Sequence, residues 1–366
     1  MKRRRTRQVT LDDVKGKTVA VGLSGGVDSS VSALALKARG ATVVGITMKL
    51  WRGQYKGGTR DACFGSGESE DIASAEALAR KIGIEYRVFD CSAAYDETIV
   101  RYFRETYLAG KTPNPCVRCN ATMKFGLLPR LARESGLAFD FFATGHYARI
   151  AEKDGRYAVR RAADEAKDQS YFLYRLSQDQ LAGHVFPLGE LTKREVREIA
   201  RAHGLGAADK PDSQDFYSGD TDELIGEAPR PGDIVDTKGR VLGRHTGFWH
   251  YTVGQRKGLG IGGAGEPYYV IDLDACRNRV IVAHAAEAEK TAFRVDDVNW
   301  MGRAPTDEPF ACLVKVRSAG RLVPAQFAAG VVTPEKGLAG VAPGQSAVCY
   351  DPETGAILCG GVIQRD

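Results

Sequence analysis

An apolar run at residues 19–23 leads directly into the glycine turn SGGVDSS at residues 24–30, and a helical apolar pattern follows. The run has the length and β-branched content of a buried strand, and after the turn Val27, Val31 and Leu34 recur at helical spacing. Strand, glycine turn and helix in this order are typical of a parallel α/β sheet, in which each helix carries the chain back to the start of the next strand. This unit constrains the fold more than any other feature of the chain.

The same turn predicts a binding site for phosphate groups. The free N–H groups of the first helical turn and the positive end of the helix dipole point to one spot, and two glycines allow an anion to approach the backbone closely. Ser24, Ser29 and Ser30 could add hydroxyl donors, whereas the Asp28 carboxylate would face phosphate only across a magnesium ion. We therefore expect the pyrophosphate of ATP here. The alternative is a tight turn followed by an ordinary N-cap.

Two other phosphate signatures fail. Residues 16–18 (GKT) resemble the end of a Walker loop, but Leu11 stands where that loop requires glycine. Residues 258–263 satisfy G-x-G-x-x-G, but no amphipathic helix follows them, so we interpret them as a glycine-rich loop.

Composition places the chain among ordinary globular proteins and limits its partners. The 366 residues are 43% hydrophobic and 27% charged, and no apolar run is long enough to span a bilayer. The basic start at residues 1–7 lacks the apolar segment of a secretion signal, so we expect a cytoplasmic protein with no membrane partner and with its eight cysteines mostly reduced. The net charge of +5 and scattered basic residues suit a phosphate backbone without requiring one.

Charge, hydrophobic periodicity and turn signals divide the chain into four parts. Residues 1–16 read as a basic, solvated tail. Residues 17–212 alternate predicted strands (42–48, 85–89, 139–144) with predicted helices (70–81, 95–108, 123–134, 193–203), as a parallel sheet requires. After that, short runs separated by turn signals predict a small, mostly β central domain at 213–288 and a β-barrel at 289–366.

A second motif, TPNPCVRCN at residues 112–120, carries the only close pair of cysteines. Its prolines exclude a helix through the first half and predict a stiff loop that presents thiols. Arg118, Lys124 and a following helix start would lower the pKa of these thiols. The alternatives are two buried thiols or half of a zinc site, although the remaining cysteines offer no second pair at zinc-ligand spacing.

Six segments together resemble the tRNA-specific 2-thiouridylases, from about residue 17 to residue 363. They are SGGVDSS (24–30), GITMKLW (45–51), NPCVRCN (114–120), TGHYAR (144–149), KDQSYFL (167–173) and YTVGQRKGL (251–259). The resemblance implies an N-terminal ATP-pyrophosphatase domain, a small central domain and a C-terminal β-barrel that together grip a tRNA anticodon arm. It also implies a reaction in which ATP adenylates the C2 oxygen of the wobble uridine and sulfur then displaces AMP, leaving 2-thiouridine.

The resemblance also implies roles for individual residues. The ATP site would comprise Gly22, Leu23, Ser24, Gly25, Gly26, Val27, Asp28, Ser29, Met48 and Gly145. Cys119 would attack or carry persulfide sulfur, and Asn114, Pro115 and Cys116 would meet the target base. The tRNA would contact His146, Lys167, Asp168, Gln169, Arg317, Ser318 and Gln345, and Ser318 replaces a usual tyrosine. His146 taken alone reads equally well as a scaffold histidine.

The chain departs from the family pattern in how it handles sulfur. Tyr217 stands where the family carries a second catalytic cysteine, and Cys116 stands where an aspartate is more usual. A phenol cannot carry or resolve a persulfide. One hypothesis is that Cys116 replaces the missing thiol by closing a disulfide with Cys119. The other is that Cys116, Cys119 and Cys63 hold an iron–sulfur cluster whose open iron binds sulfide.

Two functions outside this reading stay open at the level of sequence. Another ATP pyrophosphatase, such as a ligase for a small molecule, would share the first loop without needing the cysteine pair. A tRNA-binding module that has lost sulfur transfer would explain the missing cysteine. The sulfur donor, whether a cysteine desulfurase, a sulfur-relay protein or free sulfide, is not encoded in any motif.

Overall fold

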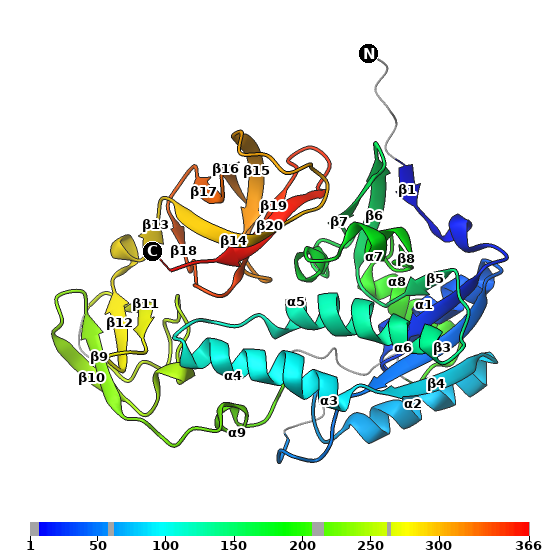
Figure 1. The fold of residues 1–366 in the computed structure, drawn as a ribbon, viewed down its shortest axis with the longest axis horizontal. Helices are drawn as coiled ribbons and strands as arrows, with labels where there is room; N and C mark the ends of the chain where they lie inside the picture. The colour runs from blue at the N-terminus through cyan, green and yellow to red at the C-terminus, as the bar shows by residue number, and fades with distance from the viewer. Residues whose placement is uncertain (1–6, 58–61, 207–215, 262–264, 366) are drawn as a thin grey trace.

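The computed structural model describes residues 7–57, 62–206, 216–261 and 265–365. A parallel sheet with its helices lies at one end of the molecule, and two β domains lie at the other (Figure 1). Between them run two long helical segments. This arrangement confirms the expected fold class of a parallel α/β domain followed by a small β domain and a barrel.

The sheet has the strand order β4-β3-β2-β5-β8, and every neighbouring pair is parallel. Its central strand β2 is fully buried at Val19, Ala20 and Val21, because helices cover both faces. One face packs against α1, α2 and α8, and the other against α6. The bounds are β2 (Thr18–Gly22), α1 (Val27–Ala38), β3 (Thr42–Lys49), α2 (Glu68–Ile82), β4 (Glu85–Asp90), α6 (Leu128–Glu134), β5 (Phe141–Ala143), β8 (His184–Val185) and α8 (Lys193–Ala202).

Two helical segments connect the sheet to the β domains, running side by side (Figure 1). The first joins α3 (Ser92–Tyr95) to α4 (Arg101–Leu108) through a π-helical stretch at Asp96–Val100. The second joins α5 (Pro115–Cys119) to α6 through a π-helical stretch at Asn120–Leu127. The second segment begins well before the predicted residue 123, because Pro115 occupies the first helical position, where its missing N–H costs nothing.

Residues 7–14 correct the assignment of residues 1–16 to a solvated tail. β1 (Arg7–Val9) pairs with β6 (Ala148–Lys153), which pairs with β7 (Arg156–Arg161), all antiparallel. A short helix at Leu11–Val14 follows, capped by Thr10, and Val14 is fully buried. The solvated tail was predicted from the many basic residues of this segment. The segment packs on the domain through its few apolar side chains, such as Val14. Residues 1–6 lie outside the described residues.

The two β domains follow the parallel-sheet domain in the sequence. The central domain is a sheet with the order β10-β9-β12-β11, in which only the β9/β12 pair is parallel. The C-terminal domain is a closed barrel with the order β14-β17-β16-β15-β19-β20. The bounds are α9 (Thr221–Ile225), β9 (Gly232–Asp236), β10 (Val241–His245), β11 (Tyr269–Asp274), β12 (Arg279–Ala283), β14 (Phe293–Trp300), β15 (Phe310–Lys315), β16 (Val323–Ala328), β17 (Val331–Pro334), β19 (Ser346–Tyr350) and β20 (Ile357–Ile363).

Smaller elements complete the description. They are α7 (Gln178–Ala182), the two-stranded pair β13 (Glu289–Lys290) and β18 (Leu338–Ala339), and short 3-10 turns at Ser170–Leu173, Phe248–His250 and Ala285–Glu287. In the described part of the chain, no helix has both the length and the apolar character needed to cross a bilayer.

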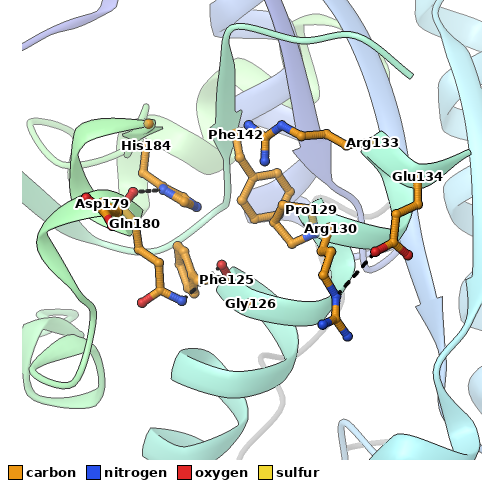
Figure 2. Close-up of a pocket in the computed structure, with 11 residues that line it drawn as sticks. Phe125, Gly126, Pro129, Arg130, Arg133, Glu134, Phe142, Asp179, Gln180 and His184 are labelled. Atoms are coloured by element: carbon orange, nitrogen blue, oxygen red, sulfur yellow. Dashed lines mark hydrogen bonds and ion pairs between the residues drawn. The ribbon is translucent and has the colours of Figure 1, made fainter. Parts of the chain in front are cut away.

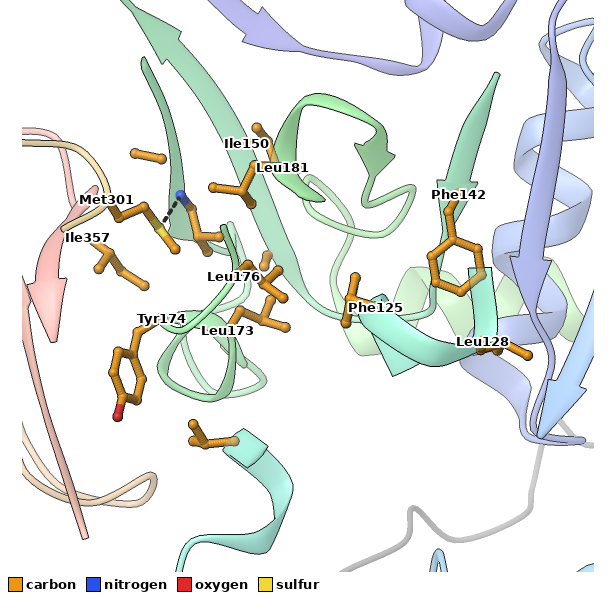
Figure 3. Packing of buried hydrophobic residues seen from close by; sticks show 14 of the residues in the cluster. Phe125, Leu128, Phe142, Ile150, Leu173, Tyr174, Leu176, Leu181, Met301 and Ile357 are labelled. Carbon is orange, nitrogen blue, oxygen red and sulfur yellow. Dashed lines mark hydrogen bonds between the residues drawn. The ribbon is translucent and has the colours of Figure 1, made fainter. Parts of the chain in front are cut away.

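One hydrophobic core joins the parallel sheet to the barrel (Figure 3). Phe142 of β5 and Leu128 of α6 belong to the same buried cluster as Met301, Tyr350 and Ile357 of the C-terminal domain. Hydrogen bonds also cross this junction, among them one from the Tyr171 hydroxyl to the Ser346 carbonyl at 3.0 Å and one between the hydroxyls of Ser170 and Tyr350 at 3.1 Å. The barrel is therefore docked on the parallel-sheet domain through packed side chains.

Candidate active site

The glycine turn between β2 and α1 is shaped by close contact with α2. Gly25 has φ +72°, and a Cβ there would lie 2.6 Å from the Asp71 carbonyl oxygen, so only glycine fits. Gly26 is the N-cap of α1 and offers no side chain to bond its first amides. The first turn of α1 therefore leaves its N–H groups for an anion, as the sequence predicted.

The serines of the turn hold the loop together. Ser29 and Ser30 donate their hydroxyls to the Gly26 carbonyl at 3.1 and 2.7 Å, and the Ser24 amide donates to the Ser29 oxygen at 3.2 Å. Ser24 is the exposed member, whereas Ser30 is 1% exposed. The Gly26 carbonyl accepts both the Ser29 and the Ser30 hydroxyls here, so the expectation that they donate to a ligand stays a prediction.

The Asp28 carboxylate pairs with a lysine that lies 165 residues later in the sequence. Lys193 Nζ, at the first residue of α8, donates to both Asp28 oxygens at 2.7 and 2.9 Å, and the Tyr147 hydroxyl donates to Asp28 at 2.9 Å. A cation at a helix N-terminus opposes the helix dipole, so Lys193 needs such a partner. A lysine at the first position of a helix is therefore a sequence signal for a buried acidic partner. The sequence analysis did not identify Lys193 as a site residue.

Gly145 closes the turn from the side of β5. A Cβ at Gly145 would lie 2.8 Å from the Ser29 amide nitrogen and 2.9 Å from the Asp28 carbonyl carbon. The chain leaving β5 therefore runs against the first turn of α1. Met48, near the carboxyl end of β3, is partly buried, and Met48 and Cys119 both pack against one hydrophobic cluster. Because β2 and β3 are parallel neighbours, Met48 and the glycine turn after β2 lie at the same edge of the sheet.

The two motif cysteines lie in a helix rather than in a loop. The Asn114 side chain caps α5 by accepting from the Val117 amide at 3.3 Å, and Cys116 and Cys119 follow within its single turn. The predicted loop is thus confined to the residues before Pro115. From the barrel, Gln345 donates to the Pro113 carbonyl at 2.7 Å, which ties the start of this helix to the C-terminal domain.

Cys119 contradicts the prediction of a thiol with a lowered pKa. Burial raises the pKa of Cys119 to about 11, although the charge of Lys124 partly opposes this shift. Arg118 does not reach the thiol; its guanidinium lies 4.6 Å from the centre of the Tyr102 ring. The sequence names the neighbouring charges but cannot show that desolvation outweighs them.

Four cysteines gather around the buried ring of Tyr95. Cys63, Cys116 and Cys119 all act electrostatically on the Tyr95 hydroxyl, and together with burial they raise its pKa. Cys91 lies beside Cys119, and burial raises the pKa of Cys91 to about 12. Even so, in the described ranges no three cysteine, histidine or acidic side chains are arranged to hold a metal ion. The side chains as placed do not fit the iron–sulfur ligand set of Cys63, Cys116 and Cys119.

Tyr217 fills the position of the missing cysteine as a packing residue. It is 8% exposed, and its hydroxyl donates to Glu223. Burial and the Glu223 carboxylate raise the pKa of Tyr217, so the phenol stays protonated. Its ring lies 6.1 Å from that of Phe64, whose amide donates to the Phe216 carbonyl at 2.9 Å. Residues 207–215, which include the start of this motif, lie outside the described residues.

Comparison with known proteins decides the family. The tRNA methyl transferase HUP domain, the tRNA methyl transferase PRC-barrel domain and the aminomethyltransferase β-barrel domain match residues 17–217, 222–284 and 290–363. The tRNA-specific 2-thiouridylase MnmA of Endomicrobium trichonymphae is 42% identical over 94% of this chain and 98% of its own. That of Chloroflexus aurantiacus is 44% identical over 95% and 98%, and that of Xanthobacter autotrophicus 45% over 96% and 94%.

The chain belongs to the tRNA-specific 2-thiouridylase family. Among solved structures, a 4-thiouridine synthetase in complex with RNA and ATP is similar over 57% of this chain and 46% of that chain, at 17% identity and a TM-score of 0.37.

Several residues expected to contact tRNA in this 2-thiouridylase family member are occupied within the protein. His146 is 9% exposed, lies 2.7 Å from the Thr144 hydroxyl through Nδ1 and packs its ring against Phe125. Burial lowers its pKa well below the usual value, so the imidazole is neutral. The Asp168 side chain is 2% exposed and accepts from Ser170, and Gln169 accepts from the Tyr147 amide at 2.9 Å.

Other expected tRNA contacts lie on the surface or at domain junctions. Ser318 is exposed and Lys167 half-buried. Arg317 donates to the Gly340 carbonyl at 3.1 Å and to the Val253 carbonyl, so it links the barrel to the central domain. The roles of these residues toward RNA stay predictions.

A cavity of about 340 Å³ lies apart from all these residues, between α6, β5 and β8 (Figure 2). Phe125 and Phe142 form its apolar wall, and Arg130 and Arg133 stand at its side (Figure 2). His184 faces it with a buried Nε2 that has no partner in the structure, and burial lowers the pKa of His184 to about 4. None of the predicted site residues lines this cavity.

Proposed function

We propose that this chain catalyses ATP-dependent 2-thiolation of the wobble uridine of tRNA. The observation that carries the proposal is a glycine turn with free first-turn amides after β2, on a parallel sheet in which Cys119 lies beside Cys91 at the carboxyl end of β4. The curated relatives span nearly the whole chain, so the proposal covers all of its domains. A small-molecule ligase would use the anion site but has no need of thiols beside it.

In the first step, the C2 oxygen of the uridine attacks the α-phosphorus of ATP and pyrophosphate leaves. The step is needed because a carbonyl oxygen is a poor leaving group, whereas an adenylate departs readily. The first-turn amides of α1 would stabilise the charge that develops on pyrophosphate. Magnesium supplies further charge neutralisation when bound to ATP, and because Lys193 and Tyr147 already occupy Asp28, we infer that the ion arrives with the nucleotide.

In the second step, sulfur adds to C2 and AMP leaves. Cys119 is the thiol that attacks or carries sulfur, and Asn114, Pro115 and Cys116 lie at the start of its helix, where the flipped base would enter. Cys119 is partly buried, and the side chains packed around it would limit the access of water that could hydrolyse the adenylate back to uridine. A second thiol is needed if the sulfur arrives as a persulfide, because its reduction to sulfide takes two electrons.

The β domains would hold the tRNA. The barrel fixes the thiol helix through Gln345, and Arg317 joins the barrel to the central domain, so RNA bound across both domains would lie beside the reacting edge. We expect tRNA and a sulfur donor, such as a cysteine desulfurase, a sulfur-relay protein or free sulfide, to meet the enzyme in the cytoplasm.

The test is mass spectrometry of nucleosides from unmodified tRNA after anaerobic incubation with the protein, ATP, magnesium and either a persulfide or sulfide. We expect 2-thiouridine that requires ATP and, when persulfide is the donor, Cys119. Pyrophosphate release without tRNA but with a small acid would favour the ligase instead. Binding of tRNA without 2-thiouridine from either donor would favour a module that has lost sulfur transfer.

A further inference from the structure

This inference rests on the proposed function and concerns the thiol that replaces the missing cysteine. Tyr217 is buried and its hydroxyl is bonded to Glu223, so the position itself carries no sulfur chemistry. The electrons that reduce persulfide sulfur must come from another pair of groups. Cys116, Cys91 and Cys63 are the described thiols near Cys119.

Cys116 is poorly placed to form a disulfide with Cys119. Both belong to the same turn of α5, three residues apart. At this spacing in a helix the Cβ atoms are about 5 to 6 Å apart. A disulfide needs about 3.5 to 4.5 Å between them. The helix would have to unwind against the Asn114 cap and the barrel contact at Pro113.

Cys91 is close to Cys119 but closed to reagents. It is 2% exposed, and burial raises its pKa to about 12. A sulfur donor therefore cannot reach it.

Cys63 is both exposed and near Cys119. It lies between β3 and α2, outside any helix, and its charge acts on Cys119. The following residue, Phe64, packs its ring 4.9 Å from Tyr95, and its amide donates to the Phe216 carbonyl at 2.9 Å. Cys63 is therefore held beside the very segment in which Tyr217 replaces the cysteine.

We propose that Cys63 is the second catalytic thiol, which takes sulfur from the donor and forms a transient disulfide with Cys119. The assignment follows from exposure and position. Cys63 is the member of the group that faces solvent outright, whereas Cys119 is packed against the reacting edge of the sheet. Cys63 would thus take the sulfur from the donor, and Cys119 would release it as sulfide near the base.

Sulfur passes from the donor to Cys63 and is then released as sulfide. A donor persulfide, R–S–SH, transfers its outer sulfur to the Cys63 thiolate, which becomes Cys63–S–SH while R–S⁻ leaves. The Cys119 thiolate then attacks the Cys63 sulfur, forming the Cys63–Cys119 disulfide and expelling HS⁻. The sulfide adds to C2 of the adenylated uridine and AMP leaves. The two thiols supply the two electrons, and an external dithiol reduces the disulfide for the next turnover.

The experiment compares full-length C63S, C116S and C119S with C276S, a control at an exposed cysteine in the central domain. Each variant receives ATP, magnesium and unmodified tRNA, with either cysteine persulfide or sodium sulfide as donor. We expect C63S to lose persulfide-dependent 2-thiouridine to the level of C119S, yet to keep sulfide-dependent 2-thiouridine and pyrophosphate release. C276S should match the unmodified protein with both donors.

A second readout follows the disulfide directly. After one turnover with persulfide and no reductant, peptide mapping should find Cys63 joined to Cys119. Full persulfide activity in C63S would overturn the proposal, as would loss with both donors, which would mark a structural role. Iron with acid-labile sulfide in anaerobically purified protein would favour a cluster instead. If the unmodified protein makes no 2-thiouridine from either donor, the proposed function itself fails.

Discussion

At the scale of single residues, the site is governed by burial as much as by charge. The sequence showed Lys124 and Arg118 beside the thiols and therefore predicted reactive thiolates, but desolvation raises the pKa of Cys119 to about 11. A thiol in this state is protected from chance oxidation and alkylation at neutral pH.

This pKa predicts how Cys119 reacts with iodoacetamide. Because only the thiolate reacts, we expect the alkylation rate of Cys119 to rise about tenfold per pH unit from pH 7 to pH 10, without a plateau in that range. K124Q should slow the reaction further, since it removes the charge that lowers the pKa. Peptide mass spectrometry measures the rate, and exposed Cys276 serves as the internal reference. A plateau below pH 9 would contradict the assignment.

Among the site residues, local signals were readable and distant pairings were not. SGGVDSS predicted the turn between β2 and α1, and Gly145 does lie against it. The partner of Asp28 is 165 residues away in the chain, and no local pattern encodes such a distance. The same holds for Cys63 and Cys119, whose proximity depends on how the segment at Phe64 pairs with Phe216.

At the scale of elements, most helices and strands were predictable because their periodicity is strong. Most of the predicted strands and helices of the sheet domain match the structure to within a few residues, although β5 is shorter than expected and β8 was not predicted. The failures lie where a short local signal competes with composition. The basic residues led to the prediction of a solvated tail where β1 forms. The prolines led to the prediction of a loop where α5 begins, because Pro115 occupies the first position of the helix instead of preventing it.

The ion pair between Asp28 and Lys193 joins α1 to α8. K193M removes the cation that both Asp28 oxygens accept from and leaves a partly buried carboxylate facing the anion site. We expect a loss of about 2 kcal/mol in the free energy of unfolding and weaker ATP binding, because the uncompensated charge repels phosphate.

Urea denaturation and ATP titration measure the two effects. R194M is the matched control, since Arg194 is the next residue on the same helix and its side chain is 83% exposed. A double-mutant cycle with D28N should show coupling between the two positions. Equal effects of K193M and R194M, or no coupling, would count against the ion pair.

At the scale of the whole molecule, the barrel and the catalytic sheet share one core. Ile357 and Tyr350 of the barrel belong to the cluster that contains Phe142 and Leu128, whereas Ile363 belongs to the core inside the barrel. The domain order was predictable from texture and from the family resemblance. The shared core was not, since nothing in the sequence says which face of a barrel meets a sheet.

Two alanine substitutions in one strand test this sharing. I357A and I363A each remove a buried isoleucine from β20 and should each cost about 2 to 5 kcal/mol. Hydrogen exchange measured by mass spectrometry should show faster exchange in β5 and α6 for I357A, but only within the barrel for I363A. Effects confined to the barrel in both variants would mean that the domains are stable separately.

The contact between Gln345 and the segment before the thiol helix has a consequence for how the enzyme comes into being. The carbonyls that Gln345 holds belong to residues 112 and 113, and the ribosome makes Gln345 more than 230 residues after them. A nascent chain therefore displays a nucleotide-binding sheet long before its sulfur chemistry is aligned. The helix that carries Cys116 and Cys119 therefore gains its contact with the barrel only after nearly the whole chain has been synthesised.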